Sequence, residues 1–387
     1  MRRQSNWPVL LSLFFLCNVL PASCKKGPFD ERVRSIMQDY DCYGVSLVLV
    51  KDYKISFSKT YGYNPDYSDS TLRKPIKNDD ISWIASISKT FITTAIMQLQ
   101  ERGLLSVDDD VNKYLDFPVR NPNYPDKPIT IRMLMYHTSS LNGKKDCWNF
   151  DQLQPQLNKN YKSYYMDYAP GDDFSYCNLG YNLLAAIIEK VSGKRFDEYL
   201  DANIMKPLNL YGGYDITKLD STRFIRTMRY SQKSKKFRKV KVTYKYNKER
   251  VDHYVLGYSV PCFWPPGGMK ISATDLASFM LMHMNYGQYG DGARIISEDS
   301  ERKMREYIPY GVHKYGMALA HYTNIIWGVE LVGMTGGSRG IHSVMFFHPE
   351  KKYGFVVICN GCTSKSMNGI QMNREIVRAM YDCFINK

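Results

Sequence analysis

The chain has 387 residues, 44% of them hydrophobic, which suffices for one large globular domain or two closely packed ones. Its nine cysteines are scattered along the chain, which excludes a small protein stapled by disulfides. The formal net charge of +14 comes mostly from residues 223–250, where twelve lysines and arginines accompany a single acidic residue, Glu249.

The first 24 residues have the pattern of an export signal. Two arginines precede an apolar core at residues 9–20 and a run of small residues. This core is too short to span a membrane stably. Cys24 resembles the lipid-modified cysteine of bacterial lipoproteins, although Pro21 stands where those signals usually have leucine. We therefore expect residues 25–387 to be an exported domain, periplasmic or at the cell envelope, with a membrane anchor at Cys24.

The S-x-x-K pattern supplies the nucleophile and its activating lysine in one class of serine hydrolases. It occurs at Ser23/Lys26, Ser56/Lys59, Ser86/Lys89 and Ser300/Lys303. Residues three apart share a face on a helix but point to opposite faces on a strand. Residues 44–63 alternate in polarity like a β-hairpin. Ser56 and Lys59 would therefore lie on a strand and point to opposite faces of it. The first pair borders the export signal, and the last lies in a polar helix without an apolar wall around its lysine.

The third pair satisfies the geometric requirement. The stretch "SISKTFITTAIMQLQERGLL" places hydrophobic residues at helical spacing, which predicts a helix that begins at Ser86. Ser86 and Lys89 would share its first turn, where backbone N–H groups favour developing negative charge. The alternative interpretation is that Ser86 is only the helix cap.

Further helices are predicted at 129–141 and 181–193, and further strands within 311–360. Strands at both ends with helices between them predict an α/β protein. Its antiparallel sheet would come from residues 25–85 and 211–387 and would be flanked by helices. Residues 86–210 would form a mainly helical inserted part of the same domain.

Two other segments have competing interpretations. The basic residues of 223–250 alternate with aromatic and apolar ones, as in exposed hairpins. We interpret them as a solvated edge; the alternative is a surface for anionic lipids or nucleic acid. An exported protein rarely meets nucleic acid, so we expect no such partner. Cys359 and Cys362 in "CNGC" resemble half a zinc site, but no second pair at ligand spacing accompanies them. We expect neither a metal nor an organic cofactor.

Seven stretches in order complete a resemblance to a known family. They read "WIASISKT", "LLSVDDDVNKYLD", "ITIRMLMYHTSSL", "PGDDFSYCNLGYN", "FDEYLDANIMKPLNL", "WPPGGMKISATDLASFM" and "GMTGGSRGIHSVMFFHPEKKYGFVVICNG". This series resembles the serine β-lactamase and penicillin-binding-protein-like family, specifically its class C branch. That branch includes β-lactamases, D-alanyl-D-alanine peptidases, D-aminopeptidases and esterases. The resemblance covers residues 40–380 and implies a β-lactamase/transpeptidase-like fold.

The resemblance also implies roles for individual residues. Ser86 would be the nucleophile and Lys89 its activating partner. Tyr176 would pass the proton between nucleophile and leaving group, and Asn178 would orient the substrate. The backbone N–H groups of Ser86 and Gly337 would form the oxyanion hole. His137 and the acidic run 108–110 would be structural, as a turn and as caps.

The third motif of the family departs from its usual form. It reads Met334-Thr335-Gly336, where a lysine or histidine normally comes first. Methionine has no charge, which predicts weaker recognition of β-lactams and C-terminal carboxylates. Arg339, five positions on, is a second candidate for that charge. Some esterases of the family also lack the basic residue.

We expect a serine hydrolase that works through an acyl-enzyme. Its expected substrates are esters, then D-amino-acid amides or peptides, then β-lactam-like compounds. The alternative is a catalytically weak or inactive binding or scaffold protein that keeps the fold, and the missing charge at Met334 is its main support.

The predicted lipid on Cys24 can be tested by fractionation. Cys24→Ala should release the protein from membranes into the soluble periplasmic or secreted fraction, because the side chain that carries the lipid is gone. Mass spectrometry of the mature N-terminus checks the modification directly. A wild-type protein that is already soluble and begins at an unmodified residue would contradict the prediction.

Overall fold

The computed structural model describes residues 26–65, 73–145, 148–231, 233–240, 251–310, 313–362 and 369–386. The predicted export signal, with Ser23 and Cys24, lies outside these residues, as does the second part of the basic segment, 241–250. Within the described ranges, no helix is both long enough and apolar enough to cross a bilayer.

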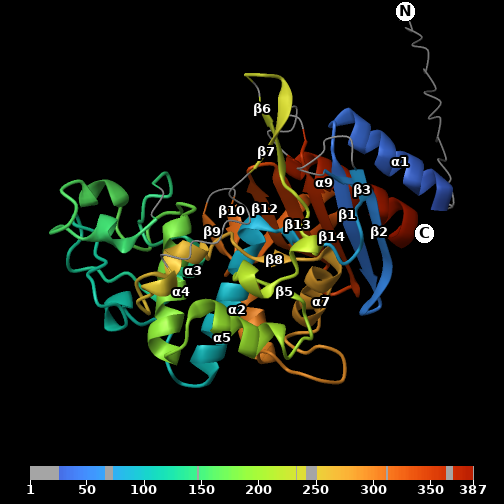
Figure 1. Cartoon of the computed structure of the whole chain (residues 1–387). Coiled ribbons are helices and arrows are strands. Elements are labelled where there is room, and N and C mark those ends of the chain that lie inside the picture. Colours follow the sequence, from blue (N-terminus) through green and yellow to red (C-terminus); the bar gives the residue numbers. More distant parts are fainter. Residues whose placement is uncertain are drawn as a thin grey trace, which may run out of the picture.

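A nine-stranded antiparallel sheet dominates one half of the molecule (Figure 1). Its strands are β1 (Gly44–Lys51), β2 (Lys54–Pro65), β3 (Arg73–Pro75), β9 (Ile308–Tyr310), β10 (His313–Tyr315), β11 (Ala320–Ile326), β12 (Val329–Ser338), β13 (Ile341–Phe347) and β14 (Tyr353–Asn360). Their order is β3-β2-β1-β14-β13-β12-β11-β10-β9. Gly44 pairs with Asn360 and Lys51 with Tyr353, so strands from the two chain ends meet in the middle of the sheet. The predicted sheet is confirmed.

Helices cover both faces of this sheet. Helices α1 (Lys26–Asp39) and α9 (Gly369–Met380) pack on one face, against side chains such as Leu47 of β1. Helix α7 (Ala273–Met284) lies on the other face, which Val48 of β1 lines. This alternation of Leu47 and Val48 is the period-two pattern of a strand buried on both sides.

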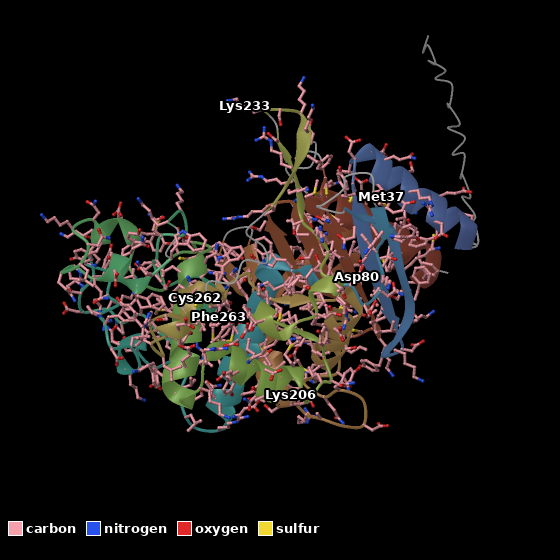
Figure 2. The ribbon with its side chains drawn as sticks, viewed as in Figure 1. Met37, Asp80, Lys206, Lys233, Cys262 and Phe263 are labelled. Carbon is pink, nitrogen blue, oxygen red and sulfur yellow. The ribbon has the colours of Figure 1, made fainter. Side chains whose placement is uncertain are left out.

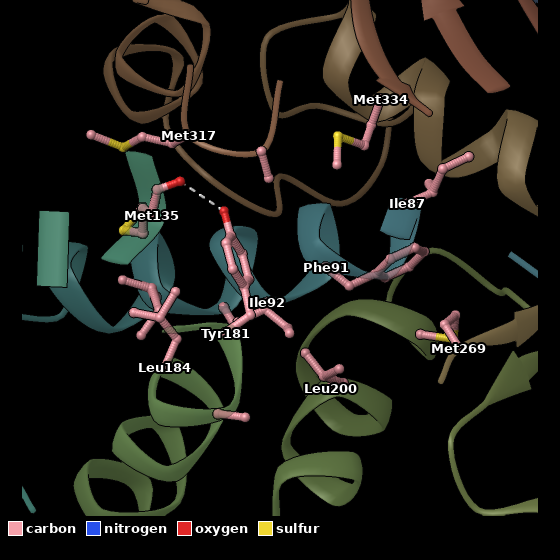
Figure 3. Packing of buried hydrophobic residues seen from close by; sticks show 14 of the residues in the cluster. Ile87, Phe91, Ile92, Met135, Tyr181, Leu184, Leu200, Met269, Met317 and Met334 are labelled. Carbon is pink, nitrogen blue, oxygen red and sulfur yellow. Dashed lines mark hydrogen bonds between the residues drawn. The ribbon is translucent and has the colours of Figure 1, made fainter. Parts of the chain in front are cut away.

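Helix α2 (Ser88–Glu101) packs beyond α7, and the rings of Phe91 and Phe279 stack at 3.7 Å between centroids. The remaining helices are α3 (Ile131–Tyr136), α4 (Asn178–Ser192), α5 (Phe196–Leu200) and α8 (Glu298–Arg305). Helix α4 contacts α2, α3 and α5. Figure 3 shows Tyr181 of α4 reaching α3, where its hydroxyl donates to the Met135 carbonyl at 2.9 Å. Helices α2 to α5 all fall within residues 86–210, where helices were predicted.

Two small sheets complete the fold. Strands β4 (Ser82–Trp83), β8 (Lys270–Ile271) and β5 (Gly212–Gly213) pair beside the start of α2. Strands β6 (Met228–Ser231) and β7 (Lys236–Lys239) form a separate hairpin. This hairpin projects from the body, with Lys233 near its outer end (Figure 2). The exposed hairpin predicted for the basic segment is therefore confirmed for its described part, although it is not an edge of the main sheet.

Candidate active site

Ser86 lies in a short 3₁₀ turn, η1 (Ala85–Ile87), that joins strand β4 to helix α2. Ala85 has a φ of 49°, in the left-handed region that residues with a side chain rarely adopt. Its neighbours are buried, but Ser86 itself is partly exposed. The helix thus begins two residues later than predicted, and the turn before it presents the serine. Such strained turns cluster at functional sites.

The Lys89 amine lies beside Ser86 and has no exposed surface. Its Nζ is 3.1 Å from Ser86 Oγ, 2.8 Å from Asn178 Oδ1 and 2.9 Å from the Pro266 carbonyl oxygen. Burial lowers the pKa of Lys89 to about 7, because the charged form loses hydration. A substantial fraction of this amine is therefore neutral near pH 7, as a general base requires.

The three contacts also orient the amine. The carbonyl of Pro266 and Oδ1 of Asn178 can only accept hydrogen bonds, so each takes one N–H from Lys89. A neutral amine has two N–H groups and one lone pair. With both N–H groups engaged, the lone pair points at the third neighbour, Ser86 Oγ. The geometry therefore directs Lys89 to remove the serine proton.

Tyr176 supplies a second hydroxyl at the site. Its ring centre is 4.9 Å from Lys89 Nζ. The residue is 36% exposed, but partial desolvation by its surroundings raises the pKa of Tyr176, and the nearby Ser86 hydroxyl lowers it only in part. At neutral pH the phenol therefore keeps its proton and is able to donate it.

A chain of hydrogen bonds fixes the loop that carries Tyr176. The Cys177 N–H donates to His137 Nδ1 at 3.1 Å, so the ring proton of neutral His137 is on Nε2. That nitrogen lies 3.3 Å from the Tyr315 hydroxyl, which in turn donates to Met334 Sδ at 3.8 Å. Burial and the charge of Lys89 hold the pKa of His137 well below its usual range. With a φ of 62°, His137 is the structural turn that was expected.

Strand β12 approaches the Ser86 turn closely, and Gly336 makes this possible. A Cβ at this position would lie 2.2 Å from the Ile84 carbonyl oxygen and 2.4 Å from Ser343 Oγ. The Ser343 hydroxyl donates to the same Ile84 carbonyl at 2.7 Å and ties the sheet to the turn. The next residue, Gly337, lines the same pocket as Ser86. This placement suits the expected pair of oxyanion donors.

A pocket of about 230 Å³ opens beside the nucleophile. Its lining consists of Ala85, Ser86, Trp148, Asn178, Trp264, Pro266, Gly267, Gly337, Ser338 and Arg339. The rings of Trp148 and Trp264 are 6.5 Å apart and give the pocket an apolar wall. Arg339 has a φ of 45° and forms no ion pair with any described residue. The pocket thus combines an apolar wall with one uncompensated cation.

Three of the predicted binding residues, Met334, Thr335 and Gly336, do not line this pocket. Met334 is 3% exposed and packs in the core near Ile87 (Figure 3). Thr335 points to the opposite face of the sheet, where it interacts with the Tyr322 hydroxyl. Sequence patterns did not identify Trp148, Trp264 or the Pro266 carbonyl as components of the site, although the "PPGG" loop was expected to border the cleft.

The other described S-x-x-K pairs are not dyads. In β2, the Ser56 hydroxyl donates to the Leu49 carbonyl at 3.3 Å, and Lys59 pairs with Asp30. In α8, Lys303 pairs with Asp299 at 2.7 Å.

The acidic run 108–110 has the expected structural role. Asp108 forms an ion pair with Arg132 at 2.6 Å. Asp109 accepts a hydrogen bond from the Ser106 N–H, and Asp110 accepts one from the Asn112 N–H at the start of a short helical turn.

The sheet built from both chain ends, with helices on both of its faces, defines a β-lactamase/transpeptidase-like fold. A sequence model of the Beta-lactamase family matches residues 29–376, and the chain belongs to that family.

Among its relatives is Penicillin-binding protein 4* of Bacillus subtilis (strain 168), 28% identical over 209 residues; the match covers 51% of this chain and 39% of the relative. The chain thus spans less than half of that protein. A solved octameric penicillin-binding protein homologue from Pyrococcus abyssi has a TM-score of 0.70 and 25% identity, over 87% of this chain and 74% of the other. D-amino acid amidase from Ochrobactrum anthropi SV3 shares the fold, with a TM-score of 0.65 and 19% sequence identity. The match covers 92% of this chain and 99% of the amidase.

The lowered pKa of Lys89 predicts a characteristic pH profile. Because only the neutral amine can accept the serine proton, kcat/KM should rise about tenfold per pH unit below pH 7 and level off above it. Lys89→Arg should reduce acylation by about 10²- to 10⁴-fold, since arginine stays protonated. Lys303→Arg, at the lysine of another S-x-x-K pair, is the matched control. A flat profile, or an active Lys89→Arg enzyme, would refute the assignment.

Proposed function

We propose that the protein hydrolyses small esters and D-amino-acid amides or peptides through an acyl-enzyme at Ser86. The observation that carries this proposal is the Lys89 amine, which is buried and held by two acceptors so that its lone pair is aimed at the serine.

The reaction follows from the positions of the groups. Lys89 takes the proton from Ser86 Oγ while the oxygen attacks the substrate carbonyl carbon. The resulting oxyanion is stabilised by the backbone N–H groups of Ser86 and Gly337. Protonated Tyr176 gives its proton to the leaving group and is reprotonated from Lys89. The carbon–leaving-group bond breaks, and water then hydrolyses the acyl-enzyme by the reverse proton route.

Three features of the pocket favour these substrates. Its volume of about 230 Å³ suits a small acyl group, and Trp148 and Trp264 provide an apolar wall. Because Asn178 Oδ1 is engaged by Lys89, its amide nitrogen is left to donate to a substrate carbonyl. The shared fold with a D-amino acid amidase supports the amide class.

The proposal includes the cellular location. The signal-like residues 1–24 and the lipobox-like Cys24 favour export and a lipid anchor, with the membrane as partner. Both features precede the described part of the chain, so this portion of the proposal rests on sequence alone.

A labelling experiment combined with a substrate screen tests the catalytic proposal. A fluorophosphonate or penicillin probe should modify the peptide that contains Ser86, Ser86→Ala should lose the label, and Ser56→Ala should keep it. Short-chain esters should be hydrolysed fastest, then D-amino-acid amides, then nitrocefin. A folded protein that neither takes the label nor turns over any of these substrates would favour the scaffold alternative, for which the uncharged Met334 is the specific argument.

Arg339 should set the preference for charged substrates. A charge-assisted hydrogen bond contributes about 1.5–3 kcal/mol, so Arg339→Gln should lower kcat/KM for carboxylate-bearing substrates about ten- to a hundredfold. Matched neutral substrates should change little. Met334→Leu, a buried change outside the pocket lining, is the control and should affect both classes alike. An equal loss on both substrate classes in Arg339→Gln would mean that the arginine only shapes the turn.

A further inference from the structure

Three thiols converge on the face of the sheet opposite to the Ser86 pocket. Cys42 precedes strand β1, Cys359 is in β14, and Cys362 follows the end of β14. Their Sγ atoms all lie within 4.8 Å of one another, and those of Cys359 and Cys362 are 3.4 Å apart. The pairing of Gly44 with Asn360 explains this meeting, because it places the segments just beyond both residues side by side.

The hydrogen bonds of the Cys42 and Cys362 thiols run to neutral or soft atoms. The Cys42 thiol donates to the carbonyls of Gly44 at 3.4 Å and Asn360 at 3.6 Å. The Cys362 thiol lies 3.9 Å from the thioether sulfur of Met372. The cluster therefore offers sulfur donors from two distant parts of the chain, and no carboxylate or imidazole of the described residues belongs to it.

We propose that Cys42, Cys359 and Cys362 bind one thiophilic metal ion in a trigonal thiolate site, and that the ion is monovalent copper. Bonds of about 2.3 Å from a metal to three sulfurs place those sulfurs about 4.0 Å apart. The 3.4 Å between the sulfurs of Cys359 and Cys362 and the upper bound of 4.8 Å on all three separations are close to that value, so small side-chain movements complete the site. Zinc requires a fourth ligand in a tetrahedron, whereas thiolate and thioether donors select monovalent copper.

Binding has a defined proton balance. A cysteine must lose its thiol proton to bind copper as a thiolate, so the ion competes with protons for the three sulfur atoms. Three S–H bonds break and three copper–sulfur bonds form, while three protons pass to solvent and copper stays monovalent. The affinity for the ion should therefore increase with pH.

The cluster has a route to solvent. Cys42 is only partly buried and lines a surface cavity of about 530 Å³, together with Met37 and Arg34. Three thiolates and one monovalent ion carry a net charge of −2, and Arg34 supplies a positive charge on the wall of that cavity. The bound ion would cross-link the segment before β1 to the end of β14 and stabilise the folded state.

Copper titration of the full-length, reduced protein under anaerobic conditions tests the site. One equivalent of monovalent copper should produce thiolate-to-copper absorption in the near ultraviolet, survive competition with excess Zn²⁺ and raise Tm. Cys42→Ser and Cys359→Ser should each lose the stoichiometric band. Cys262→Ser should keep it, because this partly buried cysteine lies far from the cavity residue Met37 (Figure 2).

A second measurement uses only the wild-type protein and does not depend on the folding of variants. Alkylation of the native protein followed by peptide mapping should show that copper protects Cys42, which is the partly exposed cysteine of the three, and leaves the labelling of Cys262 unchanged. The proposal is overturned if protection is the same with and without copper, if the band survives in Cys42→Ser, or if zinc displaces copper. Formation of a Cys359–Cys362 disulfide in place of copper binding would also overturn it.

Discussion

The active site depends on the burial of one amine. Lys89 has no exposed surface, and a buried amine without acceptors would strongly destabilise the fold. Its acceptors come from two other elements: Asn178 at the start of α4, and the Pro266 carbonyl in the loop before β8. The need to satisfy this amine therefore fixes where α4 and that loop meet α2. The same loop then carries Trp264 into the pocket wall.

A second constraint joins this helical assembly to the sheet. The Ile84 carbonyl accepts from Ser343, and Gly336 leaves room for β12 to lie against the turn that contains Ser86. On the other side, His137 links the loop of Tyr176 to Tyr315 of β10. Ser86 thus lies between elements that hydrogen bonds hold in place, and such preorganisation would lower the reorganisation needed during the proposed reaction.

Local patterns predicted much of this arrangement. The period-two pattern of β1 and β2 separated Ser56 from Lys59, and the helical period of α2 brought Lys89 beside its serine. The same period-two rule could also have placed Thr335 on the face opposite to its neighbours. What local patterns could not show was contact between distant segments. The Pro266 carbonyl has no side-chain signal, and Cys42 meets Cys359 only through the register of β1 with β14.

The departure at the third motif has a physical explanation in the described structure. Position 334 is enclosed by the core and close to Tyr315, so a second ammonium there would be desolvated near Lys89, and methionine avoids that burial. The pocket obtains its cation from Arg339 instead, on the turn between β12 and β13. The carbonyl of the next residue, Gly340, accepts a hydrogen bond from the Gly361 N–H at 2.7 Å. Gly361 lies between Asn360, whose carbonyl accepts from the Cys42 thiol, and Cys362 of the thiol cluster. An ion bound by the three cysteines would restrict the motion of this segment. Through the same hydrogen bond it would also restrict the turn that carries Arg339, so the two sites on opposite faces of the sheet are coupled through one backbone contact.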